Sequence, residues 1–238
     1  MMRLDKLLAS SASISRTQAQ EAIRRGRVTV DGEVISLPEK KVDEKAALFL
    51  DGKAVAYEKY VYIMMDKPAG YLSATEDTRD PSVTELLPEE LRKRSLGIVG
   101  RLDKDTTGLL LLTNDGDLAK KLTHPTYEKK KIYQVSLDKR LARADLERLI
   151  MGITLEDGDI AADDVCYVDD PTSKNAVGIE IHSGRNRIVR RMFEHVGYRV
   201  GKPDRVYFAG LTKQKLKRGE WRFLTEKEVS MLKSGNYE

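Results

Sequence analysis

A change of hydrophobic period divides the beginning of the chain into two helices and a hairpin. Leucines recur at i, i+3 and i+4 within residues 3–10, which predicts a short helix. Ser15 and Gln18 form a capping-box pattern at the start of a second helix, which Gly26 ends. Residues 27–35 then alternate valines on either side of an Asp-Gly pair, a pattern typical of two strands joined by a tight turn.

The rest of the chain mixes strand and helix patterns, and it contains no internal repeat. An apolar strand is expected from Val61 to the Lys-Pro-Ala-Gly loop at residues 67–70, and the four leucines of residues 109–112 predict a buried strand. Further strands are predicted over residues 130–137, 163–170 and 176–184, and further helices over residues 80–88, 117–125, 143–153 and 186–198. This mixture indicates an α+β fold with a mixed, mainly antiparallel sheet flanked by helices, rather than a regular βαβ array.

Length and composition indicate a globular protein with one large or two unequal domains. The chain has 238 residues, more than one typical domain, and residues 51–60 form a charged connection between its two regions. We therefore expect a small domain over residues 1–58 and a larger one over residues 59–238. No apolar run approaches the roughly 20 residues of a membrane span. The chain starts on charged residues, and its one cysteine, Cys166, excludes an internal disulfide, so we expect a cytoplasmic protein.

Basic residues are concentrated in three short segments, although the formal net charge is only +4. The segments are residues 129–131, 185–191 and 213–218, and the second contains four arginines and no acid. A single cluster of this kind is more often a solvated surface than a binding site. Three of them together favour a polyanionic partner.

The available side chains limit the chemistry. One cysteine and three scattered histidines lack the spacings of a zinc site. Neither G-x-x-x-x-G-K-[ST] nor a G-x-G-x-x-G that follows a strand is present. We therefore expect a catalyst that relies on a carboxylate and uses neither a metal ion nor a nucleotide.

Asp103, just before the leucine strand, is the carboxylate that this expectation singles out. Desolvation raises the pKa of a carboxylate and a nearby arginine lowers it, so a reactive, ionised aspartate needs a close cation. Arg101 and Lys104 are available in the sequence. From these residues alone Asp103 is either a turn residue or a reactive group, and the turn is favoured. Asp105 and Asp115 are interpreted as turn formers.

The N-terminal region contains R-L-D-K-x-L, then S-R, then R-x-G-R-V-T-V-D-G. This pattern resembles the S4-type RNA-binding module, over roughly residues 2–50. The resemblance implies a domain that binds structured RNA. The residues expected to contact RNA are Arg3, Lys6, Ser15, Arg16, Arg24 and Arg27.

Four motifs follow one another in the rest of the chain. They are K-P-A-G at residues 67–70, G-R-L-D-K-D-T-T-G-L-L-L-L-T-N-D-G at 100–116, K-I-Y at 131–133 and G-R-N-R-I-V-R-R-M-F at 184–193. The set resembles the pseudouridine synthases, specifically the bacterial ribosomal RNA branch that carries an N-terminal S4-type module. The resemblance covers nearly the whole chain and implies an enzyme that isomerises a uridine of ribosomal RNA to pseudouridine without a cofactor. The spacing around residues 153–158 is closer to the large-subunit (23S) branch than to the small-subunit branch.

The resemblance also implies roles for individual residues. Asp103 is the essential aspartate, which either attacks C1′ or removes a C2′ proton. Tyr133 stacks on the target base, and Arg190 is the basic residue that pairs with the aspartate. The residues expected to line the uridine pocket are Val189, Arg101 and Leu102. Those expected to bind RNA are Lys67, Lys131, Arg185, Asn186, Arg187 and Arg191, although Lys67 is also expected to order its own loop.

Other interpretations stay open at this point. Tyr133 is also consistent with an ordinary strand aromatic, and Arg190 with phosphate binding alone. Ile188 and Ser183 depart from the family pattern, which has glutamine and glutamate there, and these departures concern RNA contacts. The implied partner is ribosomal RNA, free or in a pre-ribosomal particle, bound by a monomer away from membranes. The alternatives are the same reaction on 16S rRNA and a non-catalytic rRNA-binding assembly factor.

Overall fold

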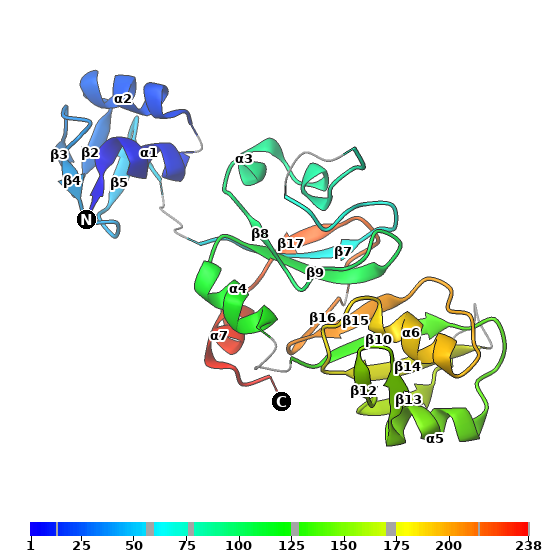
Figure 1. Cartoon of the computed structure of the whole chain (residues 1–238). Coiled ribbons are helices and arrows are strands. Elements are labelled where there is room, and N and C mark those ends of the chain that lie inside the picture. Colours follow the sequence, from blue (N-terminus) through cyan, green and yellow to red (C-terminus); the bar gives the residue numbers. More distant parts are fainter. Residues whose placement is uncertain are drawn as a thin grey trace. The chain divides into compact units, whose positions relative to one another are not determined.

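The chain divides into two compact units, Met1–Tyr60 and Val61–Glu238 (Figure 1). The structure is a computed structural model that describes residues 1–12, 14–55, 60–75, 79–124, 129–169, 175–213 and 215–237. Within these described ranges, no helix is long and apolar enough to cross a membrane. The predicted domain boundary falls at residues 56–59, outside the described residues.

The first unit packs helices on short antiparallel strands. Its elements are β1 (Met2–Arg3), α1 (Leu4–Ala12), α2 (Arg16–Arg24), β2 (Val28–Val30), β3 (Glu33–Val34), β4 (Lys41–Val42), β5 (Leu48–Leu50) and β6 (Lys53–Ala54). One sheet has the order β3-β2-β5-β6, and β1 pairs with β4. The predicted capping box of Ser15 and Gln18 starts α2, and Asp31 and Gly32 form the β2–β3 turn with φ of 50° and 87°. Residues 51–54, expected in a connection, instead complete a second hairpin.

The second unit is built on one mixed sheet. Its strands are β7 (Tyr62–Lys67), β8 (Gly97–Val99), β9 (Thr107–Thr113), β10 (Lys131–Ser136), β13 (Asp164–Tyr167), β14 (Ala176–Ile181), β15 (Asp204–Phe208), β16 (Leu211–Thr212) and β17 (Trp221–Phe223). The order is β13-β14-β10-β15-β9-β7-β17, with β16 on β15 and β8 on β9. The pairing of β9 with β15 is parallel and the others are antiparallel. The predicted α+β class with a mainly antiparallel sheet is therefore confirmed.

Helices and a short hairpin complete this unit. They are η1 (Val83–Leu86), α3 (Glu89–Arg92), α4 (Gly116–Thr123), α5 (Arg143–Met151), α6 (Ile188–His195), α7 (Glu226–Ser234), β11 (Ile153–Leu155) and β12 (Gly158–Ile160). Buried side chains of α5 and α6 share a core with β10, β13 and β14. Residues 125 and 170, at the ends of two predicted elements, lie outside the described residues.

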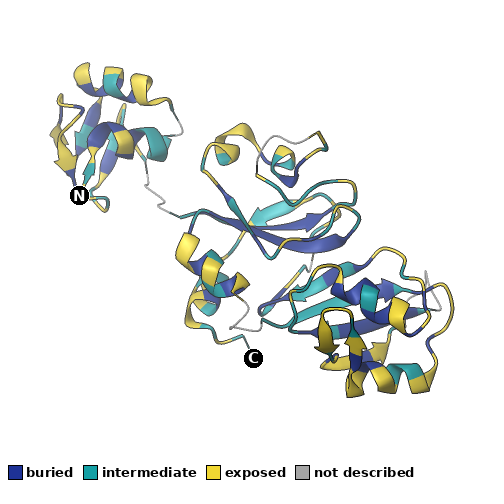
Figure 2. Cartoon of the chain, viewed as in Figure 1, coloured by how far each residue is buried: buried dark blue, intermediate teal, exposed yellow. Residues whose placement is uncertain are grey.

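The four leucines of β9 are all buried because both faces of the strand are covered (Figure 2). Leu109 and Leu111 pack in one cluster with α4 and α7, whereas Leu110 and Leu112 pack in another with the η1 region. Alternate side chains of a strand point to opposite faces, so an unbroken apolar run suits a strand covered on both sides. Each buried leucine contributes roughly 2 kcal/mol of transfer free energy.

Two of the four cations in the 213–218 segment are paired with acids of the sheet. Lys213 and Arg218 both form ion pairs with Asp66 of β7 and Asp204 of β15. Asp66 is buried, and this desolvation raises the pKa of its carboxyl group despite the two cations. At least these two charges of the third basic segment are therefore used to pair with acids of two interior strands, β7 and β15.

The start of β9 is a point of close backbone approach. Its first residues pair with parallel β15, whereas its end pairs with antiparallel β8. At Gly108 the φ is +109°, and a Cβ there would overlap the backbone nitrogen and carbonyl oxygen of Arg205. Only glycine meets both demands without strain. Gly108 therefore fixes the path by which the loop that carries Asp103 enters the sheet.

We predict that Gly108→Ala destabilises the second unit by about 3 kcal/mol or more, because the two strands must separate. Gly219→Ala is the matched control, since Gly219 has a φ of +88° but its Cβ would meet open space. Urea unfolding followed by fluorescence of Trp221, the one tryptophan of the chain, reports on this unit. Equal destabilisation by the two substitutions would contradict the close-approach argument.

Candidate active site

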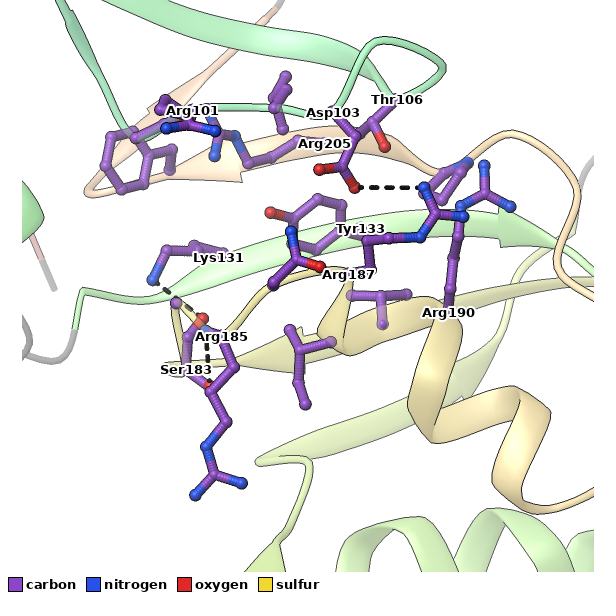
Figure 3. Close-up of a pocket in the computed structure, with 18 of the residues that line it drawn as sticks. Arg101, Asp103, Thr106, Lys131, Tyr133, Ser183, Arg185, Arg187, Arg190 and Arg205 are labelled. Atoms are coloured by element: carbon purple, nitrogen blue, oxygen red, sulfur yellow. Dashed lines mark hydrogen bonds and ion pairs between the residues drawn. The ribbon is translucent and has the colours of Figure 1, made fainter. Parts of the chain in front are cut away.

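Residues distant in sequence line a cavity of about 540 Å³ in the second unit (Figure 3). The lining contains the predicted catalytic and pocket residues Asp103, Tyr133, Arg190, Val189, Arg101 and Leu102. It also contains Lys131, Arg185, Asn186 and Arg187 from the predicted RNA-binding set. The fold thus brings residues of three of the four sequence motifs into the cavity lining. The fourth motif, K-P-A-G at residues 67–70, lies outside the lining and hydrogen-bonds to the loop that carries Asp103.

Lys67 makes these hydrogen bonds. Its ammonium shares its N–H groups among the carbonyl oxygens of Pro68 (3.1 Å), Asp103 (3.0 Å), Lys104 (3.2 Å) and Thr106 (2.8 Å). The residue is 0% exposed, and desolvation lowers the pKa of its ammonium to about 8. The expected RNA contact of Lys67 is therefore wrong, because its charge is turned into the protein. Its other expected role, ordering the loop, is the one that the geometry supports.

Asp103 points into the cavity, with 34% of its side chain exposed. The guanidinium that faces it belongs to Arg187, whose Nη1 lies 4.0 Å from Asp103 Oδ2 (Figure 3). Arg187 stands at the N-cap of α6 in the left-handed conformation, with φ 48° and ψ 28°. This uncommon backbone geometry directs a basic side chain from the start of the helix toward the loop.

The expected pairing of Arg190 with Asp103 is not what the structure has. Arg190 Nη2 pairs with Asp105 Oδ2 at 2.6 Å, and its Nη1 donates to the Val200 carbonyl at 2.9 Å. Arg190 lies in the first turn of α6, and its side chain is only 10% exposed. From that buried position Arg190 pairs with Asp105, the second acid of the loop, rather than with Asp103.

Asp105 is consequently more than a turn former, which corrects the expectation from sequence. Besides Arg190, it has Arg187 Nη1 at 3.7 Å. Asp115, in contrast, has a local structural role: its side chain accepts the backbone N–H of Leu118 and caps α4. Both acids lie close to threonine and glycine in the sequence, and only the tertiary structure separates their roles.

Tyr133 faces the cavity from β10, which pairs with β14 on one side and β15 on the other. The backbone pairing with β15 shifts between Ile132 and Tyr133, at a bulge. Bulges redirect side chains and are frequent beside active sites. Tyr133 therefore occupies a wall of the cavity, and it also packs against two hydrophobic clusters of the unit.

Arg205 is a site residue that the sequence analysis missed. It is 1% exposed, and its guanidinium donates to the carbonyls of Leu109 (2.8 Å) and Gly100 (2.7 Å). Burial lowers the pKa of Arg205, while the neighbouring Tyr133 hydroxyl raises it. It thus joins β15 to β9, to the loop before it and to the tyrosine. In the sequence, Arg205 is a single arginine within a short strand segment. Nothing in the sequence distinguishes it from an arginine on the surface.

Lys131, on the neighbouring strand β10, has a similar arrangement. Its Nζ donates to the carbonyls of Lys129 (2.9 Å), His182 (2.9 Å) and Ser183 (3.3 Å). Burial first, and then the charge of Arg205, lower the pKa of Lys131 to about 8. Lys131 lines the cavity, but its ammonium holds the backbone that leads into G-R-N-R. We therefore assign it a supporting role rather than the expected RNA contact.

Arg185 and Arg191 share one acid at the tip of the β11–β12 hairpin. Arg191 makes two bonds to the Asp157 carboxylate, at 2.9 and 2.6 Å, and Arg185 Nη1 lies 3.5 Å from it. Arg185 Nη1 also donates to the carbonyl of Gly158 at 3.0 Å. Arg185 lines the cavity, whereas Arg191 lies outside its lining.

Asp5 organises the predicted RNA-binding residues of the first unit. It is fully buried and accepts hydrogen bonds from Arg3, Arg16 and Gln20. Burial alone raises the pKa of this carboxyl group, but these donors hold it well below its usual range. The side chains of Arg3 and Arg16 remain 45% and 55% exposed, so both present a charged edge to solvent.

The other predicted contacts of this unit have separate environments. Lys6 and Arg24 are exposed, and Arg27 forms an ion pair with Asp51. The Ser15 hydroxyl accepts a backbone N–H as the cap of α2, which engages it within the protein. We therefore assign Ser15 a structural role as the cap of α2.

The cavity lining offers one accessible carboxylate, the aromatic rings of Tyr133 and Phe208, aliphatic side chains and several guanidinium groups. Among the described residues, no group of three or more His, Cys, Asp or Glu side chains could hold a metal ion. A carboxylate beside a tyrosine and an arginine can act as a nucleophile or a base on a planar, polar substrate.

We predict that Lys67→Met lowers the unfolding free energy of the second unit by about 2–4 kcal/mol, because buried carbonyls lose their donor. Lys104→Met is the control, since Lys104 is half-exposed and follows Asp103 in the same loop. Its effect is expected to stay within about 0.5 kcal/mol. Trp221 fluorescence during urea unfolding measures the unfolding free energy of each variant. Equal stability of the two variants would refute the supporting role of Lys67.

Known proteins are similar to this chain in sequence and in fold. The RNA pseudouridylate synthase model matches residues 61–195, and the S4 domain model matches residues 2–48. An uncharacterized RNA pseudouridine synthase of Aquifex aeolicus is 41% identical, over 98% of this chain and 96% of its own length. Ribosomal large subunit pseudouridine synthase B of Bacillus subtilis is 38% identical, also over 98% and 96%.

A crystal structure of a pseudouridylate synthase has a TM-score of 0.67 and 30% sequence identity to this chain. The match covers 98% of this chain and 100% of that one. Sequence and fold agree over both units, so this chain belongs to the RNA pseudouridylate synthase family and is an RNA pseudouridine synthase with an N-terminal S4 domain.

Proposed function

We propose that this enzyme isomerises one uridine of large-subunit (23S) ribosomal RNA to pseudouridine, with Asp103 as the reacting group. The observation that carries the chemistry is the partly exposed Asp103 carboxylate, which opens into the same cavity as Tyr133. The choice of RNA is supported by the name of the Bacillus subtilis relative, which is 38% identical over nearly the whole chain.

The reaction exchanges one glycosidic bond for another. The bond from C1′ to N1 breaks, the uracil turns, and C1′ joins C5, whose hydrogen leaves as a proton while N1 gains one. Asp103 either attacks C1′ and forms a transient ester, or removes the C2′ proton. Both routes start and end with a free carboxylate, and because pseudouridine is an isomer of uridine, no oxidant, reductant or cofactor is consumed.

The cavity walls suit the retention of a detached base. The Tyr133 ring offers a stacking surface, and Leu102 and Val189 add apolar contacts. Arg187 and Arg190 supply positive charge beside the two loop carboxylates. Extrusion of the uridine from its RNA stack costs a few kcal/mol, which stacking in the cavity offsets. This set of groups favours an active enzyme over a silent RNA-binding factor.

The S4 domain would bind folded ribosomal RNA, free or within an assembling subunit, as part of a cytoplasmic monomer. Its exposed cations are those that the sequence singled out, with Lys6 and Arg24 exposed and Arg3 and Arg16 fixed by Asp5. Phosphate contacts of this kind supply affinity and orientation rather than base recognition.

We predict that Asp103→Asn lowers the single-turnover rate of pseudouridine formation by about a thousandfold or more, because the amide is neither a nucleophile nor a base. RNA affinity should remain within about threefold of wild type. Mass spectrometry of a transcript containing the target measures the product, and filter binding measures the affinity. Near-normal turnover of Asp103→Asn would overturn the proposed chemistry.

We further predict that deletion of residues 1–55 weakens rRNA binding by about tenfold or more, because the cations that neutralise RNA phosphates are removed. The slope of log affinity against log salt should become shallower, by about 0.7–0.9 for each phosphate that the shortened protein no longer neutralises. Urea unfolding monitored at Trp221 is the control, because the cores of the two units are separate clusters. Unchanged affinity and salt slope would rule out the docking role.

A further inference from the structure

The cavity continues along β10 beyond the place of the target base. Tyr133 and Lys131 both line it from this strand, two residues apart. Side chains so spaced point to one face of a strand and lie roughly 7 Å from each other. Figure 3 shows Asp103 near Tyr133, with Lys131 and Arg101 on the other side of the ring. The proposed reaction places the uracil at the Asp103 end and assigns nothing to the Lys131 end.

The Lys131 end, which we call the flanking compartment, is formed by four side chains of β8, α4 and β15, namely Ile98, Leu122, Thr123 and Phe208. Phe208 pairs with Lys131 in the register of β15 on β10, which joins the compartment to the strand that carries Tyr133. Its two buried members, Leu122 and Phe208, belong to a hydrophobic cluster separate from that of Val189. Of the other two, one is partly buried and one is exposed. The compartment thus has an apolar floor and an open rim.

Two polar side chains at this end are engaged by backbone carbonyls of the protein. Lys131 Nζ donates to three such oxygens, and Thr123 Oγ1 donates to the Ala119 carbonyl at 2.8 Å. Arg101 differs, because its exposed side chain has no hydrogen bond or ion pair with another described residue. A ligand here would therefore meet apolar side chains and the plane of one guanidinium. Such surroundings suit contact with the flat face of a ring better than recognition of its edge by hydrogen bonds.

We propose that the flanking compartment binds the base of a nucleotide next to the target uridine in the RNA chain. Extrusion of the uridine breaks its stacking, so a neighbouring base loses a partner as well. Unstacked bases are bound by aromatic rings, guanidinium planes and apolar contacts. One entering RNA strand would then fill both ends of the cavity, and the second base would help to select the site. The inference rests on the proposed function, because Asp103 defines the end that receives the target.

The first experiment leaves the protein unchanged. Wild-type enzyme acts, in single turnover at limiting RNA, on transcripts that lack one base, either next to the target uridine or further along the chain. We expect loss of the base on one side of the target to lower the rate by about tenfold or more, whereas loss of a distant base changes it by less than about twofold. If neither adjacent position shows a larger decrease than the distant ones, the proposal is overturned.

A variant at the rim separates binding in the compartment from folding of the RNA. Thr123→Trp places a ring at the exposed edge of the compartment, where it competes with the neighbouring base. On the intact transcript we expect a rate about fivefold or more below wild type. On the transcript that lacks this base, the two proteins should agree within about twofold. If removal of the base slows Thr123→Trp as much as wild type, the effect belongs to the RNA and the proposal is wrong.

Thr212→Trp is the matched control. Thr212 is exposed on β16 and does not line the cavity. This variant should follow wild type within about twofold on both transcripts. Urea unfolding monitored by circular dichroism checks that both variants fold, and the transcripts with wild-type enzyme decide alone if Thr123→Trp does not. Equal effects of the two tryptophans would overturn the proposal.

Failure of the proposed function would look different from failure of this inference. It would appear as absence of product from the intact transcript with the wild-type enzyme, or as retained turnover in Asp103→Asn. An active wild-type enzyme that is indifferent to both neighbouring bases would instead leave the proposed function standing and remove the flanking compartment from RNA recognition.

Discussion

A buried ammonium group has lost its hydration and must be surrounded by oxygen atoms to remain charged. Lys67 meets this requirement with the carbonyls of the loop that carries Asp103, so the loop conformation and the lysine charge depend on each other. The register of β7 against β9, which sets Lys67 opposite Gly108, creates the arrangement. Two motifs more than thirty residues apart in sequence thus act as one structural unit.

Carboxylates position arginines at several places in this protein. Asp5 holds Arg3 and Arg16 in the S4 domain, and Asp157 holds Arg185 and Arg191 beside the cavity. A long side chain that is already fixed loses less conformational entropy when it meets a phosphate. The same pairing explains how a chain with 42 basic and 38 acidic residues can present basic edges at a modest net charge of +4. Asp105 extends this arrangement to the reaction centre.

Sequence patterns predicted the elements whose physical cause is local. The leucine run, the Ser15 capping box and the Asp31-Gly32 turn are examples. Most of the site residues named from the four motifs line the same cavity. β16 and β17 were missed because strands of two or three residues are too short to show a period without a turn signal such as the Asp31-Gly32 pair, which marked the equally short β2 and β3. The burial of Lys67 and Arg205 and the exchange of Arg190 for Arg187 beside Asp103 depend on side-chain direction across distant segments. A linear sequence without relatives does not contain that information.

The central claim is that this enzyme modifies one uridine of large-subunit ribosomal RNA. The most direct measurement is a map of pseudouridines across both ribosomal RNAs, from cells with the gene, cells without it, and cells without it that carry a restored copy. One signal in the 23S rRNA should disappear with the gene and return with the copy. Disappearance of a 16S signal instead, or maps that do not differ, would contradict it.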